Sequence, residues 1–268
     1  MRKLVINADD FGMSKEVNEG IKKGIQAGVI SNVSLLVNMP YFDDAVVFLK
    51  KNPQVSVGLH FNVTEGAPIS HRSEVGSLVR EDGNFYHWVG LIWILIRNKN
   101  VISEIKKEFH MQYEKLRRSV HKISYFDSHH HVHMFPPIFK LVLNFALKHN
   151  IRTIRGRSFK FALPLFSGTI PSLKQLIITF LCIIDNMLFH DNTHFFENDH
   201  LYDINWHPNM DKRRFLHLLD NIAEGKTQII CHPGVMSKTG NSKFLEPRRR
   251  ELLLLLDKEI QKKILQYS

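Results

Sequence analysis

The residues with the greatest potential for chemistry form a short histidine-rich segment. It runs from Asp127 to His133 and holds histidines at positions 129, 130, 131 and 133, out of 16 in the chain. Imidazole nitrogens bind zinc, iron and other divalent metals, and a neighbouring carboxylate can orient a ligand histidine. If the preceding strand continues, the odd-numbered residues lie on one face and His130 on the other. The segment indicates a metal site, with metal affinity without catalysis as the alternative.

Two adjacent carboxylates follow the first apolar run of the chain. Residues 3–8 lead directly to Asp9 and Asp10. Neighbouring side chains of a strand normally point to opposite sides, so one carboxylate could bind a metal while the other serves as a general base. The alternative is that one caps the following helix and the other lies in a surface turn.

Single histidines lie at two other points where an apolar run ends. His60 comes near the end of residues 55–61, and His232 directly precedes Pro233 and Gly234. One such histidine can be a metal ligand or a hydrogen-bonded structural residue. Proline and glycine fix a turn, so His232 is either a general acid held at the mouth of a site or a turn residue.

These residues must be positioned by the elements around them, and the apolar pattern predicts alternating strands and helices. Strands are predicted at 3–8, 34–37, 55–61, 123–128, 152–155 and 227–231. Helices are predicted over 14–28, 42–51, 102–120, 138–149, 173–189, 215–225 and 246–261. This alternation is typical of a mostly parallel α/β fold, and a (β/α) barrel gathers the carboxyl ends of its strands into one active-site mouth.

Two segments have no clear place in this pattern and are predicted to be insertions. Residues 62–85 form a loop long enough to cover a substrate. Residues 160–200 are apolar and basic, which suggests a lid or a segment that leans on a membrane surface, with a core helix as the alternative.

Length and composition favour one α/β domain over residues 1–268, with two small domains as the alternative. The net charge is +10, and residues 128–184 contain no Asp or Glu. That stretch could meet a phosphorylated, acidic or membrane-surface partner, or simply form a basic surface. No nucleic-acid-binding motif is present, so no nucleic-acid partner is expected. Two cysteines and the absence of an export signal predict a cytoplasmic protein.

Four blocks of the sequence carry a resemblance when they are taken together. They are Asn7–Gly12, Gly58–Phe61, Asp127–Pro136 and Cys231–Gly234, and they span nearly the whole chain. In this order they resemble the YdjC/ChbG-like carbohydrate deacetylases. The resemblance implies a single-domain α/β fold of the distorted (β/α), TIM-like barrel type. It also implies a hydrolase that removes N-acetyl groups from amino sugars such as chitooligosaccharides.

The resemblance further implies one divalent metal ion, with Mg²⁺ as the first choice and Zn²⁺ as the alternative. It assigns the metal ligands to Asp10, His60 and His129. Asp9 would be the general base and His232 the general acid. Arg155 could orient Asp9 or bind the sugar.

Several alternatives stay open at this stage. His131 or His133 could replace or support His129 as a ligand. Another metallohydrolase, such as a phosphoesterase, fits the basic stretch after His133, and a non-catalytic protein that binds metal or sugar fits the histidines alone. A homodimer and a weak contact with a membrane surface are also open.

Overall fold

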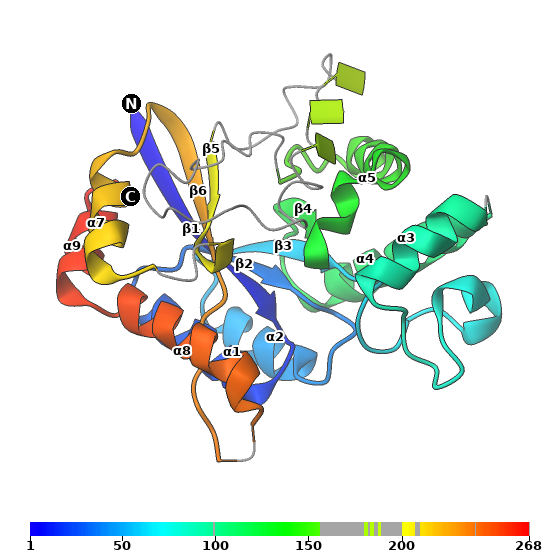
Figure 1. Cartoon of the computed structure of the whole chain (residues 1–268), viewed down its shortest axis with the longest axis horizontal. Coiled ribbons are helices and arrows are strands. Elements are labelled where there is room, and N and C mark those ends of the chain that lie inside the picture. Colours follow the sequence, from blue (N-terminus) through cyan, green and yellow to red (C-terminus); the bar gives the residue numbers. More distant parts are fainter. Residues whose placement is uncertain are drawn as a thin grey trace.

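Six parallel strands form the central sheet, in the order β4-β3-β2-β1-β6-β5 (Figure 1). The computed structural model describes residues 1–98, 100–155, 200–206, 210–238 and 240–267, with positions 180, 181, 183, 184, 187 and 188. The strands are β1 (Arg2–Phe11), β2 (Asn32–Leu35), β3 (Ser56–Phe61), β4 (Tyr125–Ser128), β5 (His200–Asp203) and β6 (Gly225–Cys231). The predicted parallel α/β architecture is therefore confirmed.

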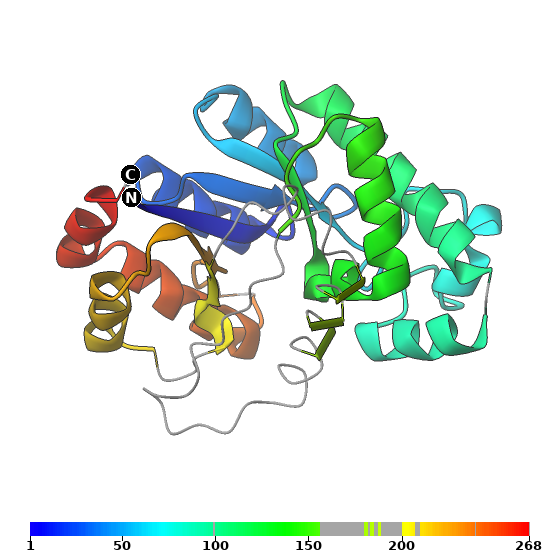
Figure 2. The same cartoon turned by 90° about the horizontal axis from the view of Figure 1, so that it is seen from above.

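Helices alternate with these strands along the chain and cover the sheet. They are α1 (Lys15–Gln26), α2 (Phe42–Lys50), α3 (Trp88–Arg97), α4 (Val101–Ser119), α5 (Pro136–Lys148), α7 (Lys212–Asp220), α8 (Ser242–Leu255) and α9 (Lys258–Leu265). Helix α1 contacts both α2 and α8, and the three lie along one face of the sheet (Figure 1). The two chain ends lie close together (Figure 2).

The predicted helix after the first strand begins as the sequence indicates. The Ser14 hydroxyl accepts a hydrogen bond from the backbone N–H of Val17 at 3.3 Å, which caps the first turn of α1. Val17, Ile21 and Ile25 are buried on one face of the helix. Their spacing of four residues places them on the stripe that packs against the sheet.

The sheet is open and forms a half-barrel in the described residues. Its two edges are β4 and β5. On the side away from β3, the described residues pair with β4 only through one parallel bridge, between Phe126 and Ile154. The strand predicted at 152–155 is reduced to that bridge. A closed TIM-like barrel has eight paired strands. The described part of the chain has the barrel's parallel order without its closure.

Other boundaries differ from the expectations for identifiable reasons. The helix predicted over 246–261 is divided into α8 and α9, because the Asp257 side chain caps a new helix through the N–H groups of Glu259 and Ile260. β5 and α3 were not predicted from the sequence. The predicted lid or membrane-leaning segment 160–200 and most of the predicted helix 173–189 lie outside the described residues.

The loop at 62–85 is tied to the rest of the fold rather than projecting freely. It contains two short 3₁₀ helices, and Val79 pairs with Phe85. The Glu108 carboxylate on α4 accepts hydrogen bonds from the backbone N–H groups of Ile69 and Ser70, both at 2.9 Å. These contacts hold the loop beside the carboxyl end of β3. None of the helices described is long and apolar enough to cross a membrane.

Candidate active site

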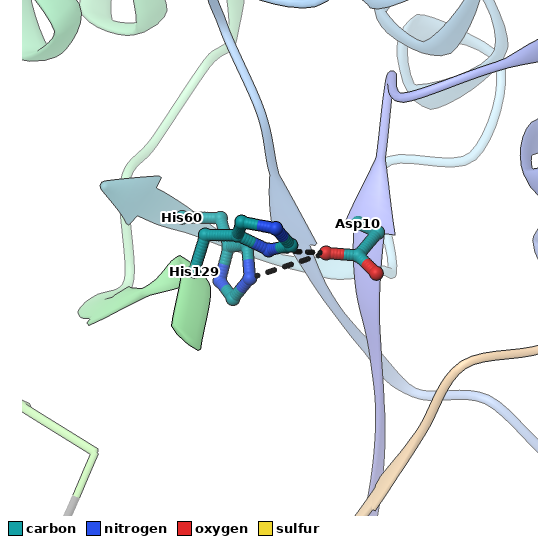
Figure 3. Close-up of side chains that lie close together, drawn as sticks. All are labelled: Asp10, His60 and His129. Atoms are coloured by element: carbon teal, nitrogen blue, oxygen red, sulfur yellow. Dashed lines mark ion pairs between the residues drawn. The ribbon is translucent and has the colours of Figure 1, made fainter. Parts of the chain in front are cut away.

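Three side chains from separate elements converge at the carboxyl end of the sheet (Figure 3). Asp10 lies on β1, His60 on β3, and His129 directly after β4. The Asp10 Oδ1 atom is 2.9 Å from His129 Nδ1 and 3.5 Å from His60 Nε2. All three residues are buried. The parallel sheet thus brings together residues that are 50 or more positions apart in the sequence.

The backbone at the end of β1 departs from a regular strand. Asp10 has a φ of 67°, in the left-handed region, and the register with β2 shifts between Ala8 and Phe11. The expectation that Asp9 and Asp10 point to opposite sides is therefore wrong. The His60 Nε2 atom lies 3.9 Å from Asp9 Oδ2 and 3.5 Å from Asp10 Oδ1, so both carboxylates reach the same ring. A non-glycine residue in this conformation costs about 1–3 kcal/mol, and such residues are frequent at functional sites.

The histidine-rich segment does not continue β4. Strand β4 ends at Ser128, and residues His129–Met134 form a 3₁₀ turn in which His130 and His131 have φ values of 55° and 59°. The side chains consequently separate, and the expected shared face is not formed. Among the four histidines, His129 alone joins Asp10 and His60 in a group of possible metal ligands.

The remaining histidines of the segment face other partners. His133 Nδ1 lies 2.5 Å from the Ser128 hydroxyl. Burial, followed by the nearby His131 and Arg155, holds the pKa of His133 well below its ordinary value, so this ring is neutral. His131 Nε2 lies 3.9 Å from Asp203 Oδ2, toward β5. These positions favour His129 as the metal ligand over His131 and His133.

The Asp10, His60 and His129 group fits a divalent metal by its donor atoms. The three ligand atoms lie within 4.8 Å of one another. The buried Asp10 Oδ1 atom accepts no well-formed hydrogen bond although two ring nitrogens face it. A cation bound between the Asp10 oxygen and the two ring nitrogens would complete this arrangement. Two imidazoles and one carboxylate also leave coordination positions for water and substrate.

Each of these histidines directs its other ring nitrogen to a carboxylate. His60 Nδ1 lies 2.7 Å from Asp127 Oδ1, and His129 Nε2 lies 3.0 Å from Glu65 Oε2. A carboxylate at the second nitrogen fixes the tautomer of a ligand histidine and leaves the first nitrogen for the metal. Burial lowers the pKa of His60, but Asp127 and Asp9 outweigh burial and raise it to about 10. The same negative charges favour a divalent cation.

Arg155 is the centre of what we call the buried cluster, which consists of Asp9, Asp127, Arg155 and His60. The Nη1 and Nη2 atoms of Arg155 donate to the two oxygens of Asp9, each at 2.6 Å, and Nη2 also lies 2.6 Å from Asp127 Oδ2. Burial raises the pKa of Asp9, but Arg155 and His60 lower it well below its usual range. With 1% of its side chain exposed, Arg155 orients Asp9 and has little surface for a sugar.

Polar side chains of the strands hydrogen-bond to this cluster or to one another beside it. Asn7 donates to Asp9 Oδ1 at 2.8 Å, Tyr125 donates to Asn7 at 2.6 Å, and Ser34 donates to Asp127 at 2.5 Å. Sequence reasoning missed Ser34, Tyr125 and the role of Asp127 toward His60. Their signal was the presence of hydrogen-bonding side chains within otherwise apolar runs.

His232 lies at the carboxyl end of β6 between two acidic residues. Its Nδ1 atom is 3.8 Å from Asp203 Oδ1 and 3.9 Å from Glu251 Oε2, and its backbone N–H donates to Glu251 Oε2 at 2.6 Å. Burial raises the pKa of Glu251 to about 7. The His232 side chain is 16% exposed, more than those of Asp10, His60 and His129. His232 is therefore held firmly at its backbone and remains accessible.

The segment after His232 is held by close backbone packing. A Cβ atom on Gly20 of α1 would lie 2.5 Å from Gly234 Cα. The N–H of Gly234 donates to the backbone oxygen of Arg248, and that of Val235 donates to Glu16. Glycine at position 20 lets α1 approach this segment, and glycine at position 234 lets Arg248 of α8 approach it. Residues 232–237 are irregular, so the turn predicted from Pro233 and Gly234 is not formed as a regular turn.

Helix α8 contributes a residue that the sequence analysis did not identify. Arg248 donates from Nη2 to Asp10 Oδ2 at 2.5 Å. Arg248 and Glu251 are buried on the same helix face as Leu245, Leu252 and Leu255. The sequence signal for this role is the position of Arg248 and Glu251, which share one face of the helix with buried leucines.

Comparisons with known proteins agree over nearly the full chain. A family model described as YdjC-like protein matches residues 3–266. A carbohydrate deacetylase of Clostridium beijerinckii is 29% identical over 266 residues, covering 96% of this chain and 93% of the relative. A chitooligosaccharide deacetylase of Escherichia fergusonii is 30% identical over 260 residues, covering 95% and 90%. A crystal structure from Enterococcus faecalis superposes with a TM-score of 0.77 and 26% identity, covering 99% of this chain and 95% of the other.

Proposed function

This chain belongs to the YdjC-like family, and on that premise we propose that it is a metal-dependent hydrolase that removes N-acetyl groups from amino sugars. Relatives named carbohydrate deacetylase and chitooligosaccharide deacetylase align along almost its whole length and support the substrate class. The observation that carries the proposal is the convergence of Asp10, His60 and His129 beside Asp9.

Asp10, His60 and His129 would hold the metal, as their donor atoms indicate. A bound divalent cation acts as a Lewis acid toward the acetyl carbonyl and makes a water molecule more acidic. We propose Mg²⁺ on the family resemblance, with Zn²⁺ as the alternative that the two imidazole ligands suit. Arg248 orients the Asp10 carboxylate through Oδ2, which leaves Oδ1 directed at the two histidines.

Asp9 serves as the general base that accepts a proton from the attacking water. Its lowered pKa keeps it ionised, and the two bonds from Arg155 fix the orientation of its carboxylate. Each carboxylate oxygen can accept more than one hydrogen bond, so the contact with Arg155 leaves capacity for a water. Arg155 is therefore a positioning residue in this proposal.

His232 serves as the general acid that protonates the nitrogen of the sugar. An amine leaves only after protonation, because its anion is far too basic to be expelled at neutral pH. Glu251 fixes the backbone of His232, and Asp203 flanks its ring at Nδ1. These contacts hold the ring while its exposed part stays available to the substrate.

The test is a screen for acetate release from N-acetylated amino sugars. Metal-free protein is reloaded separately with Mg²⁺, Mn²⁺, Co²⁺ and Zn²⁺, and acetate and free amine are measured together. The proposal predicts equal amounts of both from at least one sugar. His129→Ala should abolish this activity, whereas His121→Ala, an exposed histidine after α4, should keep it.

Two outcomes of the screen would replace the proposal. Release of phosphate from phosphorylated sugars, without acetate release, would indicate a phosphoesterase. One tight metal site without turnover of any acetylated sugar would indicate a protein that binds metal or sugar without catalysis.

A further inference from the structure

The two ligand histidines are held by carboxylates of different origin. Asp127, which holds His60, belongs to the edge strand β4 and is buried. Glu65, which faces His129, belongs to the loop after β3, and 46% of its side chain is exposed. We call Thr64, Glu65, His129 and His130 the outer cluster.

The backbone of Glu65 is fixed by an arrangement of side-chain amides. The Asn62 side chain accepts hydrogen bonds from the backbone N–H groups of Thr64 and Glu65, at 3.0 and 3.1 Å. The Glu65 backbone oxygen accepts from Asn62 and Asn38, at 2.8 and 3.0 Å. The chain then turns at Gly66, which has a φ of 71°. Three hydrogen bonds to the Glu65 backbone and one to that of Thr64 therefore fix the position of a carboxylate side chain that is accessible to water.

The partner ring is fixed from the other side. His130, in the left-handed region, lies with its ring centroid 4.0 Å from that of His129, and its Nδ1 atom is 3.0 Å from the Thr64 hydroxyl. The loop after β3 thus contacts both histidines, through Thr64 and Glu65. His129 Nε2 faces Glu65 at 3.0 Å while its Nδ1 faces Asp10 at 2.9 Å.

We propose that Glu65 is a positioning residue for His129: it accepts the Nε2–H hydrogen bond and so leaves the Nδ1 lone pair for the metal that Asp10, His60 and His129 would hold. The proposal rests on the proposed function only in taking Asp10, His60 and His129 as the metal site. It makes the loop after β3 a part of that site, because loss of the Glu65 carboxylate frees the ring to take either tautomer. Carboxylate partners of ligand histidines usually contribute about 10–100-fold to metal affinity.

A direct metal ligand is the competing role for Glu65. The atoms of Glu65, His129 and His130 also lie within 4.8 Å of one another. A second cation there would take His129 Nε2 while the first takes Nδ1, which requires the ring to lose both protons. A hydrogen bond from Nε2–H requires no such loss, so the geometry favours the positioning role.

The experiment compares Glu65→Ala, Glu65→Gln and the control Glu81→Ala, an exposed glutamate of the same loop. Metal-free full-length protein is titrated calorimetrically with MgCl₂ and with ZnCl₂. Glu65→Ala should bind about 10–100-fold more weakly, whereas Glu65→Gln, whose amide oxygen still accepts a hydrogen bond, should lose less than about tenfold. Glu81→Ala should bind as the wild type does.

A second measurement reads the Nε2–H hydrogen bond of His129, because zinc at Nδ1 leaves the ring proton on Nε2. Nitrogen-15 NMR of histidine-labelled, zinc-loaded protein should show the His129 proton on Nε2 in the wild type and in Glu65→Gln. In Glu65→Ala the signal should change, because the proton no longer has its acceptor. A role limited to folding would lower the melting temperature without changing this signal.

Three results would overturn the inference. The first is wild-type metal affinity in Glu65→Ala, and the second is an unchanged His129 Nε2 signal in that variant. The third is a stoichiometry of two metals that falls to one, which would make Glu65 a ligand. Acetate release by the wild type with any of these results refutes the inference alone. The expected affinities without acetate release from any sugar refute the proposed function alone.

Discussion

The buried and outer clusters make the same kind of contact in opposite surroundings. In each, a carboxylate faces the second nitrogen of a proposed ligand histidine: Asp127 for His60 and Glu65 for His129. Asp127 is fully enclosed and shares Arg155 with Asp9, whereas Glu65 is nearly half exposed. Water can solvate Glu65, but only protein charges can balance Asp127. We therefore expect the Asp127 contact to stabilise both the fold and the site, and the Glu65 contact to serve the site alone.

Charge balance explains the composition of the buried cluster. Asp9 and Asp127 carry two negative charges away from water, and an isolated charge there would cost several kcal/mol, about as much as a small domain's whole stability. Arg155 supplies one positive charge, and His60, whose pKa is raised to about 10, supplies another in the metal-free protein. A metal at His60 would replace that proton. The two carboxylates thus need one positive charge besides that of Arg155, and His60 lies where it can supply it.

The largest expected effect is on turnover, from Asp9→Asn in the buried cluster. The amide keeps the size of the side chain and a hydrogen-bonding oxygen but cannot serve as a base. Turnover should fall by about 10²–10⁴-fold while metal content stays near that of the wild type. Acetate release, metal stoichiometry and melting temperature are measured on one preparation. A metal-loaded, fully active Asp9→Asn would remove Asp9 from the mechanism, and loss of metal would make it a ligand instead.

The next effect is on stability, from Arg155→Met. This substitution leaves Asp9 and Asp127 buried without their shared counter-charge, so the free energy of unfolding should fall by about 3–5 kcal/mol. Urea denaturation followed by circular dichroism measures the loss. Arg155→Lys keeps the charge without the planar fork and should lose less. A loss below about 1 kcal/mol in Arg155→Met would show that the buried cluster does not depend on this residue.

A smaller effect concerns Glu251, which lies beside His232 outside the buried cluster. Its pKa is raised by burial to about 7, from an ordinary value of 4.5. The folded state therefore retains a proton that the unfolded state releases, and stability falls as pH rises from 4.5 to 7. The contribution amounts to at most about 3 kcal/mol over that range.

Replacement of Glu251 by glutamine isolates this contribution. Glu251→Gln keeps an oxygen for the His232 backbone N–H and cannot titrate. Its stability relative to the wild type should therefore increase between pH 4.5 and 7, as measured by thermal unfolding at several pH values. Parallel pH profiles of the two proteins would show that Glu251 does not carry this proton.

The sequence predicted the convergence of the site better than its supporting contacts. Asp10, His60 and His129 each follow an apolar run, and a parallel sheet places the ends of such runs at one edge. Family resemblance selected these three among 16 histidines and many acids. Arg155 was predicted only as one of two roles, and its position 146 residues from Asp9 has no local signal.

Backbone conformation explains most of what could not be predicted. Alternation in an extended strand assigns the histidine-rich segment to one face, and it separates Asp9 from Asp10. Left-handed φ values at Asp10, His130 and His131 break both patterns. Such values are rare outside glycine and depend on surrounding tertiary contacts, which no local propensity records. The contact between Glu65 and His129 depends on the 3₁₀ turn at His129–Met134, so strand alternation could not predict it either.

The smallest expected effect is that of a substitution in the outer cluster on the stability of the protein. Glu65→Gln should change the free energy of unfolding by no more than about 0.5 kcal/mol, because its exposed side chain is solvated in both the folded and unfolded states. Asp127→Asn, the matched change in the buried cluster, should cost several times more, since it leaves Arg155 with one carboxylate fewer. Urea denaturation of the two metal-free variants measures both losses. Equal losses would mean that exposure does not separate the two contacts. A large loss for Glu65→Gln alone would make the loop after β3 part of the folding core.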